Sequence, residues 1–270
     1  MRKDIINNIK NIKKYWDERA KSLIANPKAT TDDHWLRIIE IREIKRAFSK
    51  IKNKKNILDI GCGDGFSTIN IFKSFPSCNF LGGDYSENMI RNAKILLKKL
   101  RIKSPRIKFQ VMDVLDLSPI KKKFDVIISD RCIINLPTRE LQKKAIKEIW
   151  LSLKRGGYYI MVENFIEGHN VMNKLRKRLG LKEISVRWHN NYLDEKFLNS
   201  FISRYFKIST RKNISSIYYL ITRTVYSKIC QIENREPDYD NIIYKIAVGL
   251  DEAEGNYGPI NLLLLKKRQY

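Results

Sequence analysis

A glycine-rich segment, together with an acid that lies one predicted strand further along, is the part of this sequence best suited to bind a ligand. The segment runs from Asp59 to Gly65 and reads Asp-Ile-Gly-Cys-Gly-Asp-Gly, directly after a short apolar run. Its glycines let a ligand approach the backbone and tolerate positive φ angles in a turn. Asp84 ends the next apolar run, where a carboxylate can accept hydrogen bonds from the ribose of an adenosine-containing cofactor. We therefore expect such a cofactor to bind here.

Departures from the known nucleotide-binding patterns narrow the choice of cofactor. The dinucleotide fingerprint needs glycine or alanine where this chain has Phe66, and no Gly-Lys-Ser/Thr follows the turn as a mononucleotide P-loop requires. Asp59 also stands two residues before the first glycine. A carboxylate there repels a pyrophosphate but attracts a cationic sulfonium or an ammonium group. The pattern therefore favours a sulfonium cofactor.

The elements that must position these residues alternate between strands and helices. Apolar runs predict strands that begin at residue 56 and then cover 79–85, 106–114, 124–130 and 158–164, with helices at 66–75, 86–101 and 138–157. We expect Ser86 to cap the second of these helices, and Gly156 and Gly157 to end the third. Such alternation predicts a doubly wound, parallel α/β sheet, in which ligands bind outside the carboxyl ends of the strands. Acids stand at those ends: Asp59, Asp84, Asp113, Asp130 and Glu163.

The segments before and after this core have a different spacing of apolar residues. Residues 1 to about 50 predict two helices joined by a loop at 25–33, with Asp32 or Asp33 capping the second. Beyond residue 165 the pattern predicts a helix at 170–180, an irregular stretch around Trp188 and His189, and a helix from Asp194. A strand at 204–213, helices at 215–232 and 239–253 and a final strand at 259–268 follow.

These linked motifs resemble the class I S-adenosylmethionine-dependent methyltransferase family over about residues 55 to 165. The segment from Asp59 to Gly65 is similar to the first motif of the family, and Asp84-Tyr85 to its ribose-binding acid and neighbour. Asp113-Val114 resembles the pair that contacts adenine, and residues 124–136 (FDVIISDRCIINL) resemble the fourth-strand motif. The resemblance implies S-adenosyl-L-methionine as cofactor and a Rossmann-like, seven-stranded sheet whose last strand is antiparallel.

If the chain has the fold that this resemblance implies, the remaining segments cover a single methyltransferase domain. Residues 1–52 form an N-terminal helical cover and residues 53–270 the domain itself, with inserted substrate covers at 165–200 and 214–258. Within 1–52, the segment Tyr15-Trp16-Asp17-Glu18-Arg19 resembles one that folds over the amino-acid end of the cofactor, where Arg19 would pair with the cofactor carboxylate. A plain surface helix is the alternative. The cofactor-binding residues expected are Asp59, Gly61, Cys62, Gly63, Gly65, Asp84, Tyr85, Asp113, Val114, Asp130, Arg131 and Arg19.

A methyl transfer needs positioning and, for a hydroxyl acceptor, a base that takes the proton. Asp130 ends the fourth strand, where the family places residues beside the reacting methyl group, and Glu163 ends the fifth. His169 and His189 lie in the expected cover, and a neutral histidine suits a base at cytosolic pH. We therefore take Asp130, Glu163 and His189 as the candidate catalytic residues, each with a structural role as the alternative.

The acceptor is narrowed by motifs that the chain lacks. No Asp/Asn-Pro-Pro-Tyr/Phe follows the fourth strand, as amino methylation of bases or glutamine would suggest, and Cys132 lacks the Pro-Cys context of cytosine-C5 enzymes, so we expect a buried thiol there. We favour O-methylation of a sugar or other polar metabolite, because the first insertion offers polar and aromatic candidates. These are Arg176, Arg178, Arg187, Trp188, His189 and Asn190. An RNA methyltransferase and a non-catalytic scaffold that keeps the cofactor fold remain the alternatives.

Composition limits which partners, metals and cellular location the protein can be expected to have. A formal net charge of +24 suggests an anionic partner such as RNA, although the lysines are spread over nearly every segment, as compositional drift would produce. The four cysteines and three histidines show no zinc-binding spacing, so we expect no metal. Without a long apolar run or a signal peptide, we expect a cytoplasmic protein that does not insert into membranes. The Tyr- and Ile-rich helices near 215–250 leave open a lid or the interface of a homo-oligomer.

Overall fold

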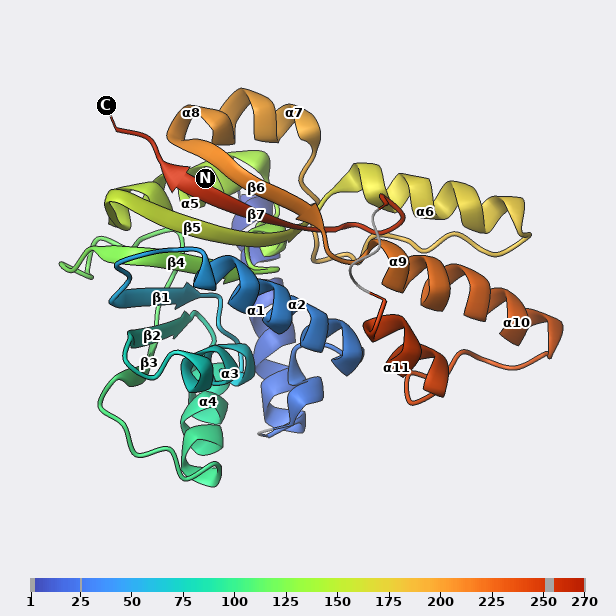
Figure 1. Ribbon diagram of the computed structural model, residues 1–270, viewed down its shortest axis with the longest axis horizontal. Helices are drawn as coiled ribbons and strands as arrows, with labels where there is room; N and C mark the ends of the chain where they lie inside the picture. Colours follow the sequence, from blue (N-terminus) through green and yellow to red (C-terminus); the bar gives the residue numbers. More distant parts are fainter. Residues whose placement is uncertain (1–2, 25, 251–254, 270) are drawn as a thin grey trace.

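The computed structural model describes residues 3–24, 26–250 and 255–269, and these form a seven-stranded mixed sheet (Figure 1). The spatial order is β3-β2-β1-β4-β5-β7-β6. β1 to β5 pair in parallel, and β7 runs antiparallel to both β5 and β6. The strands are β1 (Asn56–Ile60), β2 (Asn79–Asp84), β3 (Ile107–Val111), β4 (Phe124–Asp130), β5 (Leu153–Asn164), β6 (Phe206–Asn213) and β7 (Ile260–Lys267). The predicted Rossmann-like sheet with an antiparallel last strand is confirmed.

Helices cover both faces of the sheet, because successive strand residues point to opposite sides. Ile57 of β1 packs in one buried cluster with the helices α2, α3 and α4, whereas its neighbour Leu58 packs in a second cluster with α5. The helical elements up to the end of α5 are α1 (Lys3–Ser22), η1 (Pro27–Ala29), α2 (His34–Ser49), α3 (Phe66–Ser74), α4 (Glu87–Lys99), η2 (Ile133–Asn135) and α5 (Arg139–Ser152). Two predicted caps are confirmed: Asp33 accepts the backbone N–H of Leu36 and Ser86 that of Met89.

The predicted end of α5 at Gly156 and Gly157 is wrong. α5 ends at Ser152, and both glycines lie inside β5. Gly156 does adopt a positive φ of 69°, but it does so where the register between β4 and β5 shifts from Phe124 to Val126. The glycine therefore serves an irregularity of the strand pairing, which is the other common use of this backbone conformation.

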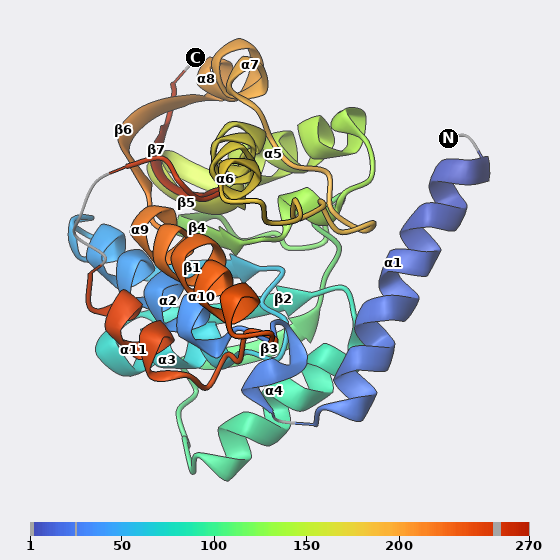
Figure 2. The same cartoon turned by 90° about the vertical axis from the view of Figure 1, so that its right-hand side faces the viewer.

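The late helices fall into two groups. They are α6 (Ile166–Arg178), α7 (Glu195–Phe197), η3 (Leu198–Ile202), α8 (Ser203–Tyr205), α9 (Ser216–Tyr219), η4 (Leu220–Val225), α10 (Tyr226–Ile232) and α11 (Ile242–Val248). One group precedes β6 (α7, η3 and α8), and the other lies at the carboxyl end of the parallel strands (α6, α9, η4, α10 and α11). α6 directly follows β5 and α9 directly follows β6, so both start from the carboxyl end of the parallel strands. Figures 1 and 2 show α6, α9, α10 and α11 projecting together beyond that end. Residues 251–254, at the end of the helix predicted for 239–253, lie outside the described residues.

Among the described residues, no helix combines the length and the apolar character that crossing a bilayer requires.

Candidate active site

A cavity of about 590 Å³ opens at the carboxyl end of the strands. One part of its wall comes from the ends of β1, β2 and β4 and from the loop after β3, and other parts come from α1, α2, α6, η4 and α11 with their neighbouring loops. Most of the residues predicted to bind the cofactor line it: Asp59, Gly61, Cys62, Gly63, Asp84, Tyr85, Asp113, Val114, Asp130 and Arg131. The topology therefore brings motifs from four separate strands into one site.

The glycine-rich turn needs its glycines for space as well as for backbone angle. Gly61, Gly63 and Gly65 all have positive φ values, of 76°, 54° and 73°. A Cβ on Gly61 would lie 2.5 Å from the sulfur of Cys132, so a side chain there would displace the neighbouring strand end. Gly65 does not line the cavity; it forms the N-cap of α3 and packs against Ala93 and Phe109. Its role is to start the helix.

Asp84 holds the turn while keeping part of its carboxylate available. One oxygen accepts the N–H of Gly63 and the other the N–H of Ser86, both at 2.9 Å. A carboxylate can accept about four hydrogen bonds in total, so both oxygens retain capacity toward the cavity. Burial raises the pKa of Asp84 to about 6, although the two N–H donors act to lower it.

Asp59 lies deeper, with a side chain that is almost wholly buried and accepts the hydroxyl of Thr68. Burial, together with the nearby charges of Asp130 and Asp84, raises its pKa to about 7. Asp130 lines the same part of the cavity, one of its buried oxygens makes no hydrogen bond, and burial also raises its pKa. Carboxylates crowded in this way lower their energy when a cation binds between them.

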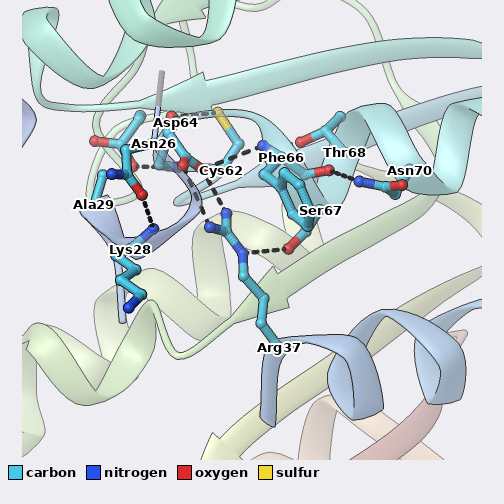
Figure 3. Close-up of polar contacts among 12 residues, drawn as sticks. Asn26, Lys28, Ala29, Arg37, Cys62, Asp64, Phe66, Ser67, Thr68 and Asn70 are labelled. Atoms are coloured by element: carbon cyan, nitrogen blue, oxygen red, sulfur yellow. Dashed lines mark hydrogen bonds and ion pairs between the residues drawn. The ribbon is translucent and has the colours of Figure 1, made fainter. Parts of the chain in front are cut away.

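Arg37 fastens α2 to the glycine-rich turn. Its guanidinium reaches both oxygens of Asp64, and its Nε lies 3.4 Å from the hydroxyl of Ser67 at the start of α3 (Figure 3). Arg37 and Asp64 are both almost fully buried. This ion pair fixes the edge of the cavity, and the sequence offered no motif that points to it.

The N-terminal helix α1 closes one side of the cavity. The Tyr85 hydroxyl donates to the carbonyl of Ile9 at 3.0 Å, and the Trp16 indole donates to the side chain of Asn135 at 3.2 Å. Tyr15 stacks on His189 of the first insertion, with ring centroids 4.7 Å apart. These contacts hold the segment beside the cavity, and Trp16 lines the cavity wall. That the segment covers the amino-acid end of the cofactor remains a prediction.

Arg19 does not take the predicted place. It is bound to the carbonyls of Lys28 and Ala29 and to the carboxylate of Asp32, and it does not line the cavity. It therefore stabilises the loop between α1 and α2, and the structure gives no support to a pairing with a cofactor carboxylate.

A model of a methyltransferase domain family matches residues 51–192. The chain belongs to the class I S-adenosylmethionine-dependent methyltransferase family. The matched residues include the glycine-rich turn, the strand-end acids and the first insertion up to Tyr192.

Individual relatives match over parts of this chain. An uncharacterized protein of Rickettsia prowazekii is 29% identical over 155 residues, which are 57% of this chain and 61% of that protein. A demethylmenaquinone methyltransferase of Lactococcus lactis is 35% identical over 109 residues, 40% of this chain and 41% of the relative. The chain thus spans less than two thirds of these curated relatives.

A solved structure shares the fold over nearly the whole chain. The N-methyltransferase NodS of Bradyrhizobium japonicum, in complex with S-adenosyl-L-homocysteine, covers 94% of this chain and 100% of its own, with a TM-score of 0.55 and 13% identity.

S-adenosylmethionine is the cofactor of this family, and the acid-lined part of the cavity fits it. Asp84 has hydrogen-bonding capacity for ribose hydroxyls, and Asp59 and Asp130 suit the cationic groups. Met112, Val114 and Leu115 supply an apolar wall for a base, beside Asp113. The assignment of these residues as cofactor ligands remains a prediction.

Of the three candidate catalytic residues, two line the cavity and one does not. Asp130 and His189 line the cavity, and so does His169. Burial, together with the charges of Arg187 and Arg19, lowers the pKa of His189 to about 4, which makes it a weak base. Cys132 also lines the cavity and is only partly buried, in contrast to the buried thiol expected.

Glu163 lies outside the cavity and is wholly buried. Its carboxyl group accepts the backbone N–H groups of Cys132, Ile133 and Ile134, which form the turn after β4. It also accepts the Ser129 hydroxyl at 3.2 Å. Glu163 is therefore an anchor for the turn that carries Asp130 and Arg131, and we do not retain it as a catalytic candidate.

One further pair escaped the sequence analysis. Glu40 of α2 is fully buried, and its carboxylate lies 3.0 Å from the Nε of Arg131. Burial raises the pKa of Glu40 to about 8 and the Arg131 charge opposes that rise. In the sequence Glu40 is one of several charged residues on a predicted helix, and no motif distinguishes it from the others.

Glu163→Ala should destabilise the fold, because three buried N–H groups and a hydroxyl would lose their acceptor. We expect the free energy of unfolding in urea to fall by about 3 kcal/mol. Glu163→Gln keeps one acceptor oxygen and should cost about 1 kcal/mol. If both variants unfold like the wild type while methyl transfer is lost, Glu163 acts in catalysis and the anchoring role is wrong.

Asp84→Ala should weaken S-adenosylmethionine binding by about 2–4 kcal/mol, the value of two charge-assisted hydrogen bonds. The ionised carboxylates also attract the cationic cofactor, so its wild-type affinity should fall as pH drops through about 7 and 6, where Asp59 and Asp84 take up protons. Calorimetry at pH 8 and pH 5 checks both statements. An affinity that is the same for the variant and at both pH values would contradict the ribose and cation assignments.

Proposed function

We propose that the protein transfers the methyl group of S-adenosylmethionine to a polar small molecule, by O-methylation of a sugar or a related metabolite. The observation that carries this proposal is the continuity of the cavity. The acid-lined part opens without a break into a wall of polar and aromatic side chains from the two insertions. Its volume of about 590 Å³ is in the range of small-ligand sites.

The insertions provide the polar wall, although not with every residue predicted. Arg176, Arg187, His189 and Asn190 line the cavity, whereas Arg178 and Trp188 do not. Trp188 is 60% exposed and packs edge-on against Tyr15. Four tyrosines complete the wall: Tyr192, Tyr219, Tyr239 and Tyr244. We interpret 165–200 and 214–258 as substrate covers and 1–52 as the cover of the cofactor.

Asp130 is the base that fits an O-methylation. When bound, S-adenosylmethionine would supply an electrophilic methyl group: the acceptor oxygen would bond to the methyl carbon while the carbon–sulfur bond breaks and its electron pair stays on sulfur. The hydroxyl proton passes to the Asp130 carboxylate, whose Oδ1 makes no hydrogen bond in the structure. Because burial raises the pKa of Asp130, its carboxylate is a stronger base than an exposed aspartate.

Asp130→Asn should lower kcat by about 10²–10⁴-fold, the usual contribution of a general base. Wild-type activity should fall at acidic pH, as the raised pKa of Asp130 brings its protonation to a higher pH, and the variant should lose this limb of the profile. The control is Asp116→Asn, an exposed loop aspartate outside the cavity.

The assay follows labelled methyl from S-adenosylmethionine into pools of saccharides, other polar metabolites and RNA. We expect label in the small-molecule pools. Label in RNA alone would support an RNA methyltransferase, and binding of the cofactor without any transfer would support a scaffold; either result contradicts the proposal.

A further inference from the structure

Arg176 is a buried cation on the cavity wall without an acidic partner. Its residue exposure is only 9%, and its side chain lines the cavity from α6. The Nε donates to the carbonyl of Lys182 at 2.8 Å, and one terminal nitrogen donates to the carbonyl of Arg223. These two bonds hold the guanidinium in place and leave its other N–H groups unused. In the described part of the chain no carboxylate forms an ion pair with it.

The other arginines on this wall all have acids beside them. Arg37 pairs with Asp64, Arg131 with Glu40, and Arg187, which is half exposed, with Asp32 at 3.8 Å. Among the described residues that line the cavity, Arg176 is therefore the one arginine whose charge no acid balances.

A second cation, Arg223, lies beside Arg176 and adds to the local positive charge. Arg223 of η4 is paired with Asp33 and donates to the Tyr244 hydroxyl at 2.7 Å. Asp33 also accepts the N–H of Leu36 and the hydroxyl of Tyr218, and it forms no ion pair with Arg176. Burial and the positive charge of Arg223 both lower the pKa of Arg176. Buried charges are normally paired, and an arginine side chain does not lose its proton in a protein, so Arg176 stays positively charged.

The charges along the cavity are thus divided between two ends. The strand ends carry Asp59, Asp84, Asp113 and Asp130, which suit a cationic cofactor. The insertion side carries Arg176, Arg187 and Arg223, and the one acid among the described lining residues beside them is Asp33, the N-cap of α2. A guanidinium whose free N–H groups face a cavity is a binding site for an oxyanion, because it can donate two parallel hydrogen bonds to carboxylate or phosphate oxygens.

From this geometry we infer that the acceptor is an acidic metabolite, whose carboxylate or phosphate group is bound by Arg176. The inference rests on the proposed function and adds the charge class of the substrate to it. Tyr219, Tyr239 and Tyr244 flank the site and can pack against the rest of the acceptor. The anion then neutralises the local excess of positive charge, and it holds the acceptor on the insertion side of the cavity with its hydroxyl free to point toward Asp130.

The test uses two simple anions on protein saturated with S-adenosyl-L-homocysteine. Inorganic phosphate and benzoate, one for each oxyanion class, are titrated against chloride at constant ionic strength while the melting temperature is recorded, since a ligand of the folded state raises it. At least one of the two should raise the melting temperature of the wild type above the chloride control. Whichever acts identifies the anion class.

Arg176→Gln should need about tenfold or more anion for the same shift, as expected for the loss of a charge-assisted contact. Arg178→Gln is the matched control, because Arg178 is exposed on the same helix and lies outside the cavity; it should respond like the wild type. Affinity for S-adenosyl-L-homocysteine should be unchanged in both variants.

The inference is overturned if neither anion stabilises the wild type beyond chloride, or if both act equally on Arg176→Gln. A loss of cofactor affinity in Arg176→Gln also overturns it, because the arginine would then serve the cofactor. If Arg176→Gln does not fold, the wild-type comparison with chloride decides alone. A wild type that binds no S-adenosyl-L-homocysteine would instead contradict the proposed function, and the anion titration, repeated without cofactor, would still be read independently.

Discussion

The structure depends on the crowding of carboxylates at the carboxyl ends of the parallel strands. β2 and β4 end in Asp84 and Asp130, β1 carries Asp59 one residue before its end, and the sheet order places these strands side by side. Burial, and after it the like charges of Asp130 and Asp84, raise the pKa of Asp59 to about 7. Such an arrangement costs stability unless cations or hydrogen-bond donors compensate for it, and the remaining features of the site supply both.

Compensation inside the protein comes from helix α2 and from the strand-end turns. Arg37 neutralises Asp64, and Arg131 is shared between Glu40 and Asp130. Backbone N–H groups serve Asp84 and Glu163. Three charged side chains on the cavity wall keep hydrogen-bonding capacity for a ligand: Asp59 and Asp130 at one end and Arg176 at the other. A cationic cofactor and an anionic acceptor would together complete the balance, so one electrostatic argument connects the cofactor site with the proposed acceptor.

The sequence predicted the parallel sheet well, because β1, β2 and β4 are apolar runs that stop at or next to an acid. It also named most of the acids and glycines that line the cavity, whose role as cofactor ligands stays a prediction. It failed where the answer depends on strand register or on long-range contacts. Asp130 is paired with Val162, so Glu163 points to the opposite face of the sheet, toward the turn at Ile133. No sequence pattern reveals that register. Arg19 and Glu40 likewise read as ordinary helix charges, because their partners lie in other elements.

The most direct measurement is a crystal structure of the protein with S-adenosyl-L-homocysteine. The account predicts the ribose hydroxyls within hydrogen-bonding distance of the Asp84 carboxylate, the adenine beside Met112 and Val114, and the sulfur near Asp130. A ligand bound elsewhere, or one whose ribose contacts no carboxylate at the end of β2, would contradict it.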